Sequence, residues 1–127
     1  VLSKNRVDDI SVISKIKKLR KLNLRSNPVK DLNPIKELIS LKELILTNIP
    51  ARNFKHLSAL RNLELLSVGW SFAFPDHPVQ VDSKELCEII SSLKNLKKLH
   101  LLDEPIPPTQ IKKLRGNLPN CQIPRGN

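Results

Sequence analysis

Leucine and isoleucine recur on one phase of this chain with a period of 22 residues. The apolar set Ile16, Leu19, Leu22 and Leu24 reappears as Leu38, Leu41, Leu44 and Leu46, and again as Leu60, Leu63, Leu66 and Val68. A fixed period of roughly 20 to 29 residues indicates units that each lay one short strand beside the last. Because a single unit cannot bury its apolar face alone, stacked units share one core. The period predicts a solenoid, and it favours binding by a surface over catalysis in a pocket.

The clearest copy of the repeat runs from Leu19 to Asn27, in the frame L-x-x-L-x-L-x-x-N. Strand side chains alternate between faces, so Leu22 and Leu24 are expected to point into the solenoid and their neighbours outward. The frame thereby predicts both the core and the outward positions of every strand.

Asparagine occupies the last position of the frame only at Asn5 and Asn27, whereas Ile49 and Ser71 stand there later. The amide of this asparagine caps backbone groups where the chain leaves the strand. We therefore expect the later turns to satisfy their backbone differently.

The period breaks after the third strand, because Leu101 lies 33 residues after Val68 instead of 22. We place an insertion at 71–81. Asp82 is a candidate N-cap, and Glu85 follows three residues later. Apolar residues at helical spacing come next, and together these signals predict a true helix of roughly ten residues. Earlier units are expected to use short helical or 3₁₀ segments, one of them starting with Asn33 as N-cap before Pro34.

The end of the chain predicts a terminal cap. Ile111, Leu114 and Leu118 fit one helix face, Gly116 suits the C-terminal turn, and Pro119 prevents continuation. Such a cap covers the apolar edge of the last repeat.

Residues 10–68 resemble the short, 22-residue class of leucine-rich repeats found in internalin-like proteins and regulatory subunits, and IKKLRGNLPNCQI resembles the segment that closes many such proteins. The resemblance implies an α/β solenoid of about five parallel strands on a concave face. Its convex face would carry 3₁₀ or short helices and then true α-helices. It also implies a non-catalytic module that binds other proteins. We expect one domain over 1–127, comprising a partial first repeat at 1–15, repeats at 16–104 and a cap at 105–127.

The first residues match the middle of a repeat, since Leu2-x-x-Asn5-x-Val7 corresponds to Leu24-x-x-Asn27-x-Val29. An uncapped first strand would expose core and an unpaired edge. We expect the native protein to extend upstream, or this edge to pair with another chain. A third reading is that the segment is a structural arm of a larger protein.

The frame also gives candidate partner-binding residues on the concave face, next to a loop that holds three of the four aromatic residues. These rings are suited to anchor a partner, or alternatively to fill the core where a narrow repeat meets a wider one. The candidates are Lys21, Asn23, Arg25, Glu43, Ile45, Thr47, Leu65, Ser67, Trp70, Phe72, Phe74, Lys98, His100 and Leu102.

The net charge of +10, from 22 basic and 12 acidic residues, favours an acidic protein surface as the partner. The alternative is a basic component of an RNA-containing or ribosome-associated assembly, although the aromatic residues lie away from the basic ones. A simpler interpretation is that the lysines occupy solvent-exposed positions of the repeat and bind no partner. The anion-contact candidates are Lys17, Lys18, Arg20, Arg61 and Lys94.

Catalysis and cofactor binding find no support in the sequence. The three histidines and two cysteines show no metal-ligand spacing, and three glycines form no phosphate-binding loop. Cys87 and Cys121 are expected to be small buried hydrophobes, which hints at a reducing compartment, although a bridge between them stays open. No run approaches the roughly 18 apolar residues of a membrane span, and the N-terminus lacks a signal-peptide layout.

Overall fold

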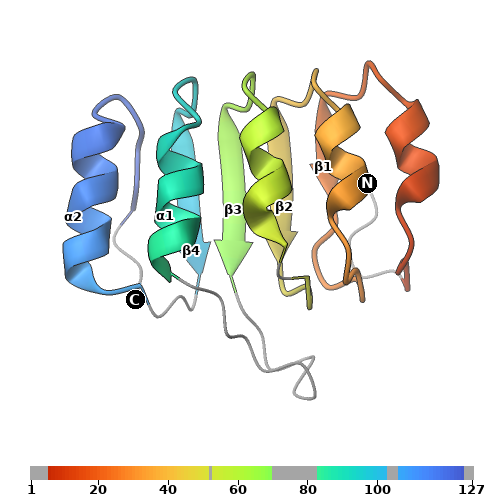
Figure 1. Cartoon of the computed structure of the whole chain (residues 1–127), viewed down its shortest axis with the longest axis horizontal. Helices are drawn as coiled ribbons and strands as arrows, with labels where there is room; N and C mark the ends of the chain where they lie inside the picture. The colour runs from red at the N-terminus through yellow and green to blue at the C-terminus, as the bar shows by residue number, and fades with distance from the viewer. Residues whose placement is uncertain (1–5, 52, 70–82, 103–105, 125–127) are drawn as a thin grey trace.

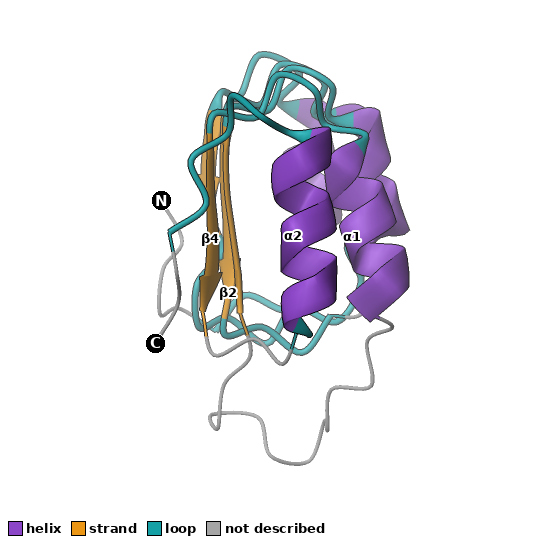
Figure 2. Cartoon of the chain, turned by 90° about the vertical axis from the view of Figure 1, so that its left-hand side faces the viewer, coloured by secondary structure: helices purple, strands orange, loops and turns teal. Residues whose placement is uncertain are grey.

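Two layers make up the part of the chain that the computed structural model describes, namely residues 6–51, 53–69, 83–102 and 106–124. One layer is a parallel sheet with the strand order β1-β2-β3-β4. The other is a row of 3₁₀ segments and α-helices that covers one face of this sheet (Figures 1 and 2). The opposite face of the sheet, which we call the open face, is the one predicted to be concave.

The sheet places the same frame position of each repeat side by side. Its strands are β1 (Lys21–Asn23), β2 (Glu43–Thr47), β3 (Leu65–Gly69) and β4 (Lys98–Leu102). The register pairs Leu22 with Leu44, Leu44 with Leu66, and Leu66 with Leu99, so the insertion leaves the alignment of the strands intact. Gln122 of the cap forms a further parallel bridge with Lys98. The predicted strand ahead of β1 involves residues 1–5, which lie outside the described residues.

The second layer changes from 3₁₀ to α-helix along the chain, as predicted. The 3₁₀ segments are η1 (Ser11–Lys15), η2 (Asn33–Glu37) and η3 (Phe54–Ala59), and the α-helices are α1 (Ser83–Ser91) and α2 (Pro108–Asn117). The fourth unit was predicted to need a helix of about ten residues, and α1 has nine. Asp82 and the insertion at 71–81 lie outside the described residues.

The leucine phase forms one continuous core between the layers, with Leu38, Leu44, Leu60 and Leu66 at most 1% exposed. Ile16 differs, because 52% of it is exposed although it occupies the same frame position as Leu38. It follows η1, the outermost 3₁₀ segment, and within the described residues no further unit lies on its outer side. The same frame position is therefore core in one repeat and surface in another.

The hydrogen bonds of the turn after each strand differ between the repeat that has the frame asparagine and the next repeat, which lacks it. Asn27 is fully buried; its side-chain oxygen accepts a hydrogen bond from the Val7 N–H at 3.1 Å and its Nδ2 donates to the Arg25 carbonyl at 3.2 Å. One repeat later Ile49 is buried, and Asn48 Nδ2 instead donates to Ser26 Oγ at 2.6 Å. The later turn thus places a different asparagine, whose side chain bonds to a serine side chain of the preceding repeat rather than to the backbone.

Side-chain caps also stack ahead of the 3₁₀ segments. Asp9 accepts from the Ser11 N–H at 2.9 Å, and Asp31 accepts from the Asn33 N–H at 2.8 Å. The assignment of Asn33 as an N-cap is wrong, because Asn33 is the first residue of η2 and Asp31 performs the capping. An aspartate readily bonds to the N–H two residues on, which accounts for the shift.

No disulfide bond joins Cys87 and Cys121. Cys87 is buried as predicted, at 4% exposure. Cys121 is only half-buried, because it lies in the exposed turn after α2, and this corrects the prediction. Partial burial still raises the pKa of the Cys121 thiol.

Candidate partner-binding face

The open face carries two outward rows of side chains, set by the register of the sheet. One row consists of Lys21, Glu43, Leu65 and Lys98, and the next of Asn23, Ile45, Ser67 and His100. These candidate residues come from four repeats along the sequence and meet on one surface. The repeat period therefore brings them together as predicted.

Two half-buried apolar side chains lie near the middle of this face. Leu65 is paired with Glu43, and Ile45 is paired with Ser67, so Ile45 and Leu65 are diagonal neighbours on adjacent strands. Side chains in that relation lie within reach of one another. Since outward positions of a solvated sheet are usually polar, the pair forms an apolar centre among the polar side chains of these two rows.

Polar and charged groups surround that centre. Lys21 Nζ lies 3.0 Å from Glu43 Oε2, which leaves this corner of the face neutral. Lys98 is exposed, and His100 and Asn23 are half-buried. Arg25 is exposed just beyond β1, where its N–H donates to Asn23 Oδ1 at 3.0 Å. An apolar centre within a polar rim is the usual arrangement of a protein-binding surface.

Two candidates offer little side-chain surface. Thr47 is 6% exposed and Ser67 is 7% exposed. Ser67 is short and stands between Ile45 and His100 in the register, so longer neighbours cover it. Thr47 ends β2, and its backbone carbonyl accepts a hydrogen bond from the Ser26 N–H of the neighbouring repeat. A partner would contact their neighbours first.

The aromatic candidates Trp70, Phe72 and Phe74 lie outside the described residues, and so does the side chain of Leu102. The chain itself links the aromatic segment to the sheet, because Gly69 ends β3 and Trp70 follows directly. Whether these rings anchor a partner or fill the core stays a prediction.

The anion-contact candidates lie in the turns that lead into β1, β3 and β4, at the edge where the strands begin. This is the upper edge of the sheet in Figure 1. Lys17, Lys18, Arg20, Arg61 and Lys94 are all exposed. Lys17 Nζ lies 3.3 Å from Glu37 Oε2, and Lys94 Nζ donates to the Asn117 carbonyl at 3.3 Å. The structure brings these five residues to one edge of the molecule.

Sequence reasoning missed three further residues of this edge. Lys42, Glu64 and Lys97 stand at the frame position of Arg20, as consecutive backbone hydrogen bonds from Lys42 to Arg20, Glu64 to Lys42 and Lys97 to Glu64 show. The hydrogen bond from Lys42 and the charge of Lys97 lower the pKa of the Glu64 carboxyl. The repeat period itself was the signal that could have found them.

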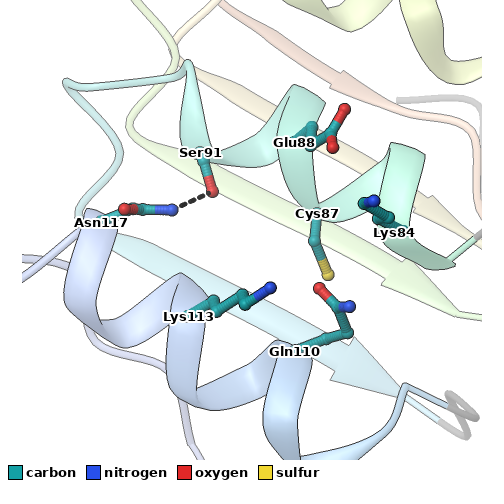
Figure 3. A pocket seen from close by; sticks show the side chains of 7 residues that line it. All are labelled: Lys84, Cys87, Glu88, Ser91, Gln110, Lys113 and Asn117. Carbon is teal, nitrogen blue, oxygen red and sulfur yellow. Dashed lines mark hydrogen bonds between the residues drawn. The ribbon is translucent and has the colours of Figure 1, made fainter.

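A small pocket lies between α1 and α2, away from the open face (Figure 3). The thiol of Cys87 points toward Gln110, and Asn117 Nδ2 donates to Ser91 Oγ at 3.1 Å. Lys84, Glu88 and Lys113 complete the lining. Its volume of about 190 Å³ is smaller than the roughly 300 to 1,000 Å³ of typical ligand pockets. The open face is therefore the stronger candidate.

Within the part of the chain that the structure describes, no three His, Cys, Asp or Glu side chains gather closely enough to hold a metal ion. No helix there has the length and apolar character needed to cross a membrane.

The two-layer architecture and the 22-residue register together define a leucine-rich repeat protein of the short-repeat class, with an α/β solenoid fold. No match came from a scan against protein-family models or from a search of curated proteins.

Solved structures do match. An internalin C2 from Listeria monocytogenes has 26% identity and a TM-score of 0.74, with 95% of this chain and 47% of the internalin covered. A leucine-rich repeat protein from Leptospira interrogans has 25% identity and a TM-score of 0.64, with 95% and 35% covered. A second Listeria monocytogenes internalin, 16% identical with a TM-score of 0.54, shares the fold. This chain thus spans less than half of each neighbour. These likenesses support the general class of protein–protein interaction modules.

Proposed function

We propose that this chain is a non-catalytic module that binds a protein partner through its open face, aided by the Trp70–Phe74 segment that follows β3. The observation that carries the proposal is the apolar centre of Ile45 and Leu65 within a polar surround. Binding energy at protein interfaces concentrates in such central apolar side chains and in aromatic anchors. The acidic character of the partner follows from Lys98 and Arg25, which are exposed beside this centre.

Affinity capture from a native lysate tests the proposal, with the wild-type chain compared with Ile45→Ser, Leu65→Ser and Trp70→Ala. Each substitution should lower the retention of the same discrete protein about tenfold, which corresponds to about 1.4 kcal/mol. Val12→Ser is the matched control, since Val12 is an exposed apolar residue on η1, in the other layer. Circular dichroism checks that each variant is folded.

Capture of the partner at the wild-type level by all four variants would contradict binding through the open face. Loss with Trp70→Ala alone would move the site to the aromatic segment. Loss with Val12→Ser of the same size would indicate unspecific apolar retention instead.

A further inference from the structure

The edge where the strands begin carries a dense and ordered set of positive charges, which we call the strand-start rim. It comprises two stacked rows: Lys17, Ile39, Arg61 and Lys94 in the turns, and Arg20, Lys42, Glu64 and Lys97 just before the strands. Six of these eight positions are basic, one is acidic and one is apolar. The open-face residues of the proposed function are not part of it.

Backbone and side-chain bonds hold the rim in place. Asn62 Nδ2 donates to the Ile39 carbonyl at 3.1 Å, and Asn95 Nδ2 donates to the Arg61 carbonyl at 2.8 Å, so the third and fourth turns are each tied to the one before. In the second row, successive N–H groups donate to the carbonyl of the preceding repeat at 2.7 to 2.8 Å. These bonds fix the spacing of the backbone from which the charged side chains extend.

The acidic residues at this edge are already engaged. Glu64 lies between Lys42 Nζ, at 3.2 Å, and Lys97 Nζ, at 3.7 Å, while Glu37 faces Lys17. Arg20 and Arg61 form no ion pair with any described residue. The rim thus keeps a positive excess that an incoming anionic partner would meet without a repelling free carboxylate.

Ile39 decides which kind of anion fits. Its side chain is 59% exposed, and it occupies in the second turn the position that Lys17 and Arg61 occupy in the first and third. A phosphate backbone gains nothing from an exposed isoleucine, and none of the eight rim positions is aromatic and able to stack on a base. An acidic protein segment with an apolar side chain matches both features.

We propose that the strand-start rim is a second docking surface, which takes an acidic protein segment whose apolar side chain covers Ile39. Four turns at the strand spacing of about 4.8 Å span about 14 Å. A helix of about 12 residues is about 18 Å long and therefore reaches across all four turns. The segment would lay carboxylates against Arg20, Arg61 and Lys94 on either side of that contact. The proposal is independent of the open-face function, which uses different residues.

Fluorescence anisotropy with labelled probes tests this surface. The probes are a peptide of four Glu-Glu-Leu repeats, its counterpart with Ser in place of each Leu, a poly-dT oligonucleotide of about 20 nucleotides, and phosphatidylserine vesicles. The Leu peptide should bind tightest, with an affinity that falls as NaCl is raised from about 50 to about 300 mM. Ile39→Ser should weaken the Leu peptide about tenfold and leave the Ser peptide unchanged.

Charge reversal provides the second arm. Arg61→Glu should weaken both peptides more than tenfold, whereas Lys55→Glu, the same charge change on η3 in the same repeat, should have a small effect. Since Arg61, Ile39 and Lys55 are exposed, these variants keep the core. Capture through Ile45 and Leu65 should survive Arg61→Glu, which separates the two proposals.

Three outcomes would overturn the rim proposal. The first is tighter binding of poly-dT or of vesicles than of the Leu peptide. The second is an Ile39→Ser variant that binds the Leu peptide as wild type does. The third is a Lys55→Glu effect equal to that of Arg61→Glu, which would reduce the interaction to net charge.

Discussion

At the scale of single residues, two short polar side chains link the turns of neighbouring repeats. Ser26 and Asn48 both adopt a left-handed backbone, with φ of 62° and 64°, one repeat apart. That conformation costs a non-glycine residue roughly 1 kcal/mol or more. The 2.6 Å hydrogen bond between their side chains helps to offset it. The turns that follow β1 and β2 are thereby tied to each other.

The cap at Asp31 predicts a local contribution to acid sensitivity. The N–H of Asn33 and then the side chain of Asn53 lower the pKa of the Asp31 carboxyl below its ordinary 3.8. A carboxyl with a lowered folded pKa stabilises the fold fully above pH 3.8, and this stability is lost as the pH falls through the folded value. Asp31→Asn should therefore reduce the loss of unfolding free energy at acidic pH. Asp31→Ala should also destabilise the protein at neutral pH.

Urea unfolding followed by circular dichroism, at neutral pH and at about pH 2.5, checks this expectation. Asp8→Asn is the control, because Asp8 is exposed and hydrogen-bonds to none of the described residues. A loss of unfolding free energy at acidic pH that is unchanged in Asp31→Asn would show that the cap carries no proton linkage.

At the scale of elements, each 3₁₀ segment and its strand form a thin unit whose stability depends on the units beside it. Leu38 is 1% exposed, since units pack on both of its sides, whereas Ile16 at the same frame position is 52% exposed. Residues at the same frame position therefore contribute differently to the free energy of unfolding.

Truncation to alanine at these two positions tests that difference. Leu38→Ala should cost about 2 to 5 kcal/mol of unfolding free energy, because it leaves a cavity in a closed core. Ile16→Ala should cost less than about 1 kcal/mol, because its side chain already contacts water. Chemical denaturation measures both, and equal losses would mean that Ile16 is buried in solution by another surface.

At the scale of the whole molecule, α2 and the segment after it pack beside β4 and against the core. Leu114 is fully buried, Ile123 is 8% exposed, and Gln122 extends the sheet beside β4. Leu118 and Cys121 are tied by a backbone hydrogen bond in the turn between them. The cap thus covers both the core and the strand edge.

Leu114→Asp should detach this cap, because a carboxylate at a fully buried position loses its hydration. The exposed core and the freed edge of β4 should then increase self-association relative to wild type. Size-exclusion chromatography with light scattering measures this, with Lys112→Asp on the exposed side of α2 as control. A folded Leu114→Asp variant with the wild-type mass would contradict the capping role.

The sequence by itself determined the period, the inward leucines, the strand register and the change from 3₁₀ to α-helix. These follow from local rules, because side-chain alternation and helical spacing are properties of a short stretch of chain. The open-face rows of Ile45 and Leu65 followed from the same period, as did part of the basic edge.

Only the tertiary structure decided how much of each predicted residue is exposed. Ser67 is covered by its neighbours across the sheet, Ile16 lacks a covering unit among the described residues, and Asp31 in place of Asn33 caps η2. Ile39 became notable only once its exposure and its place among the rim cations were known. Burial and pairing depend on side chains from other repeats, which no single repeat encodes.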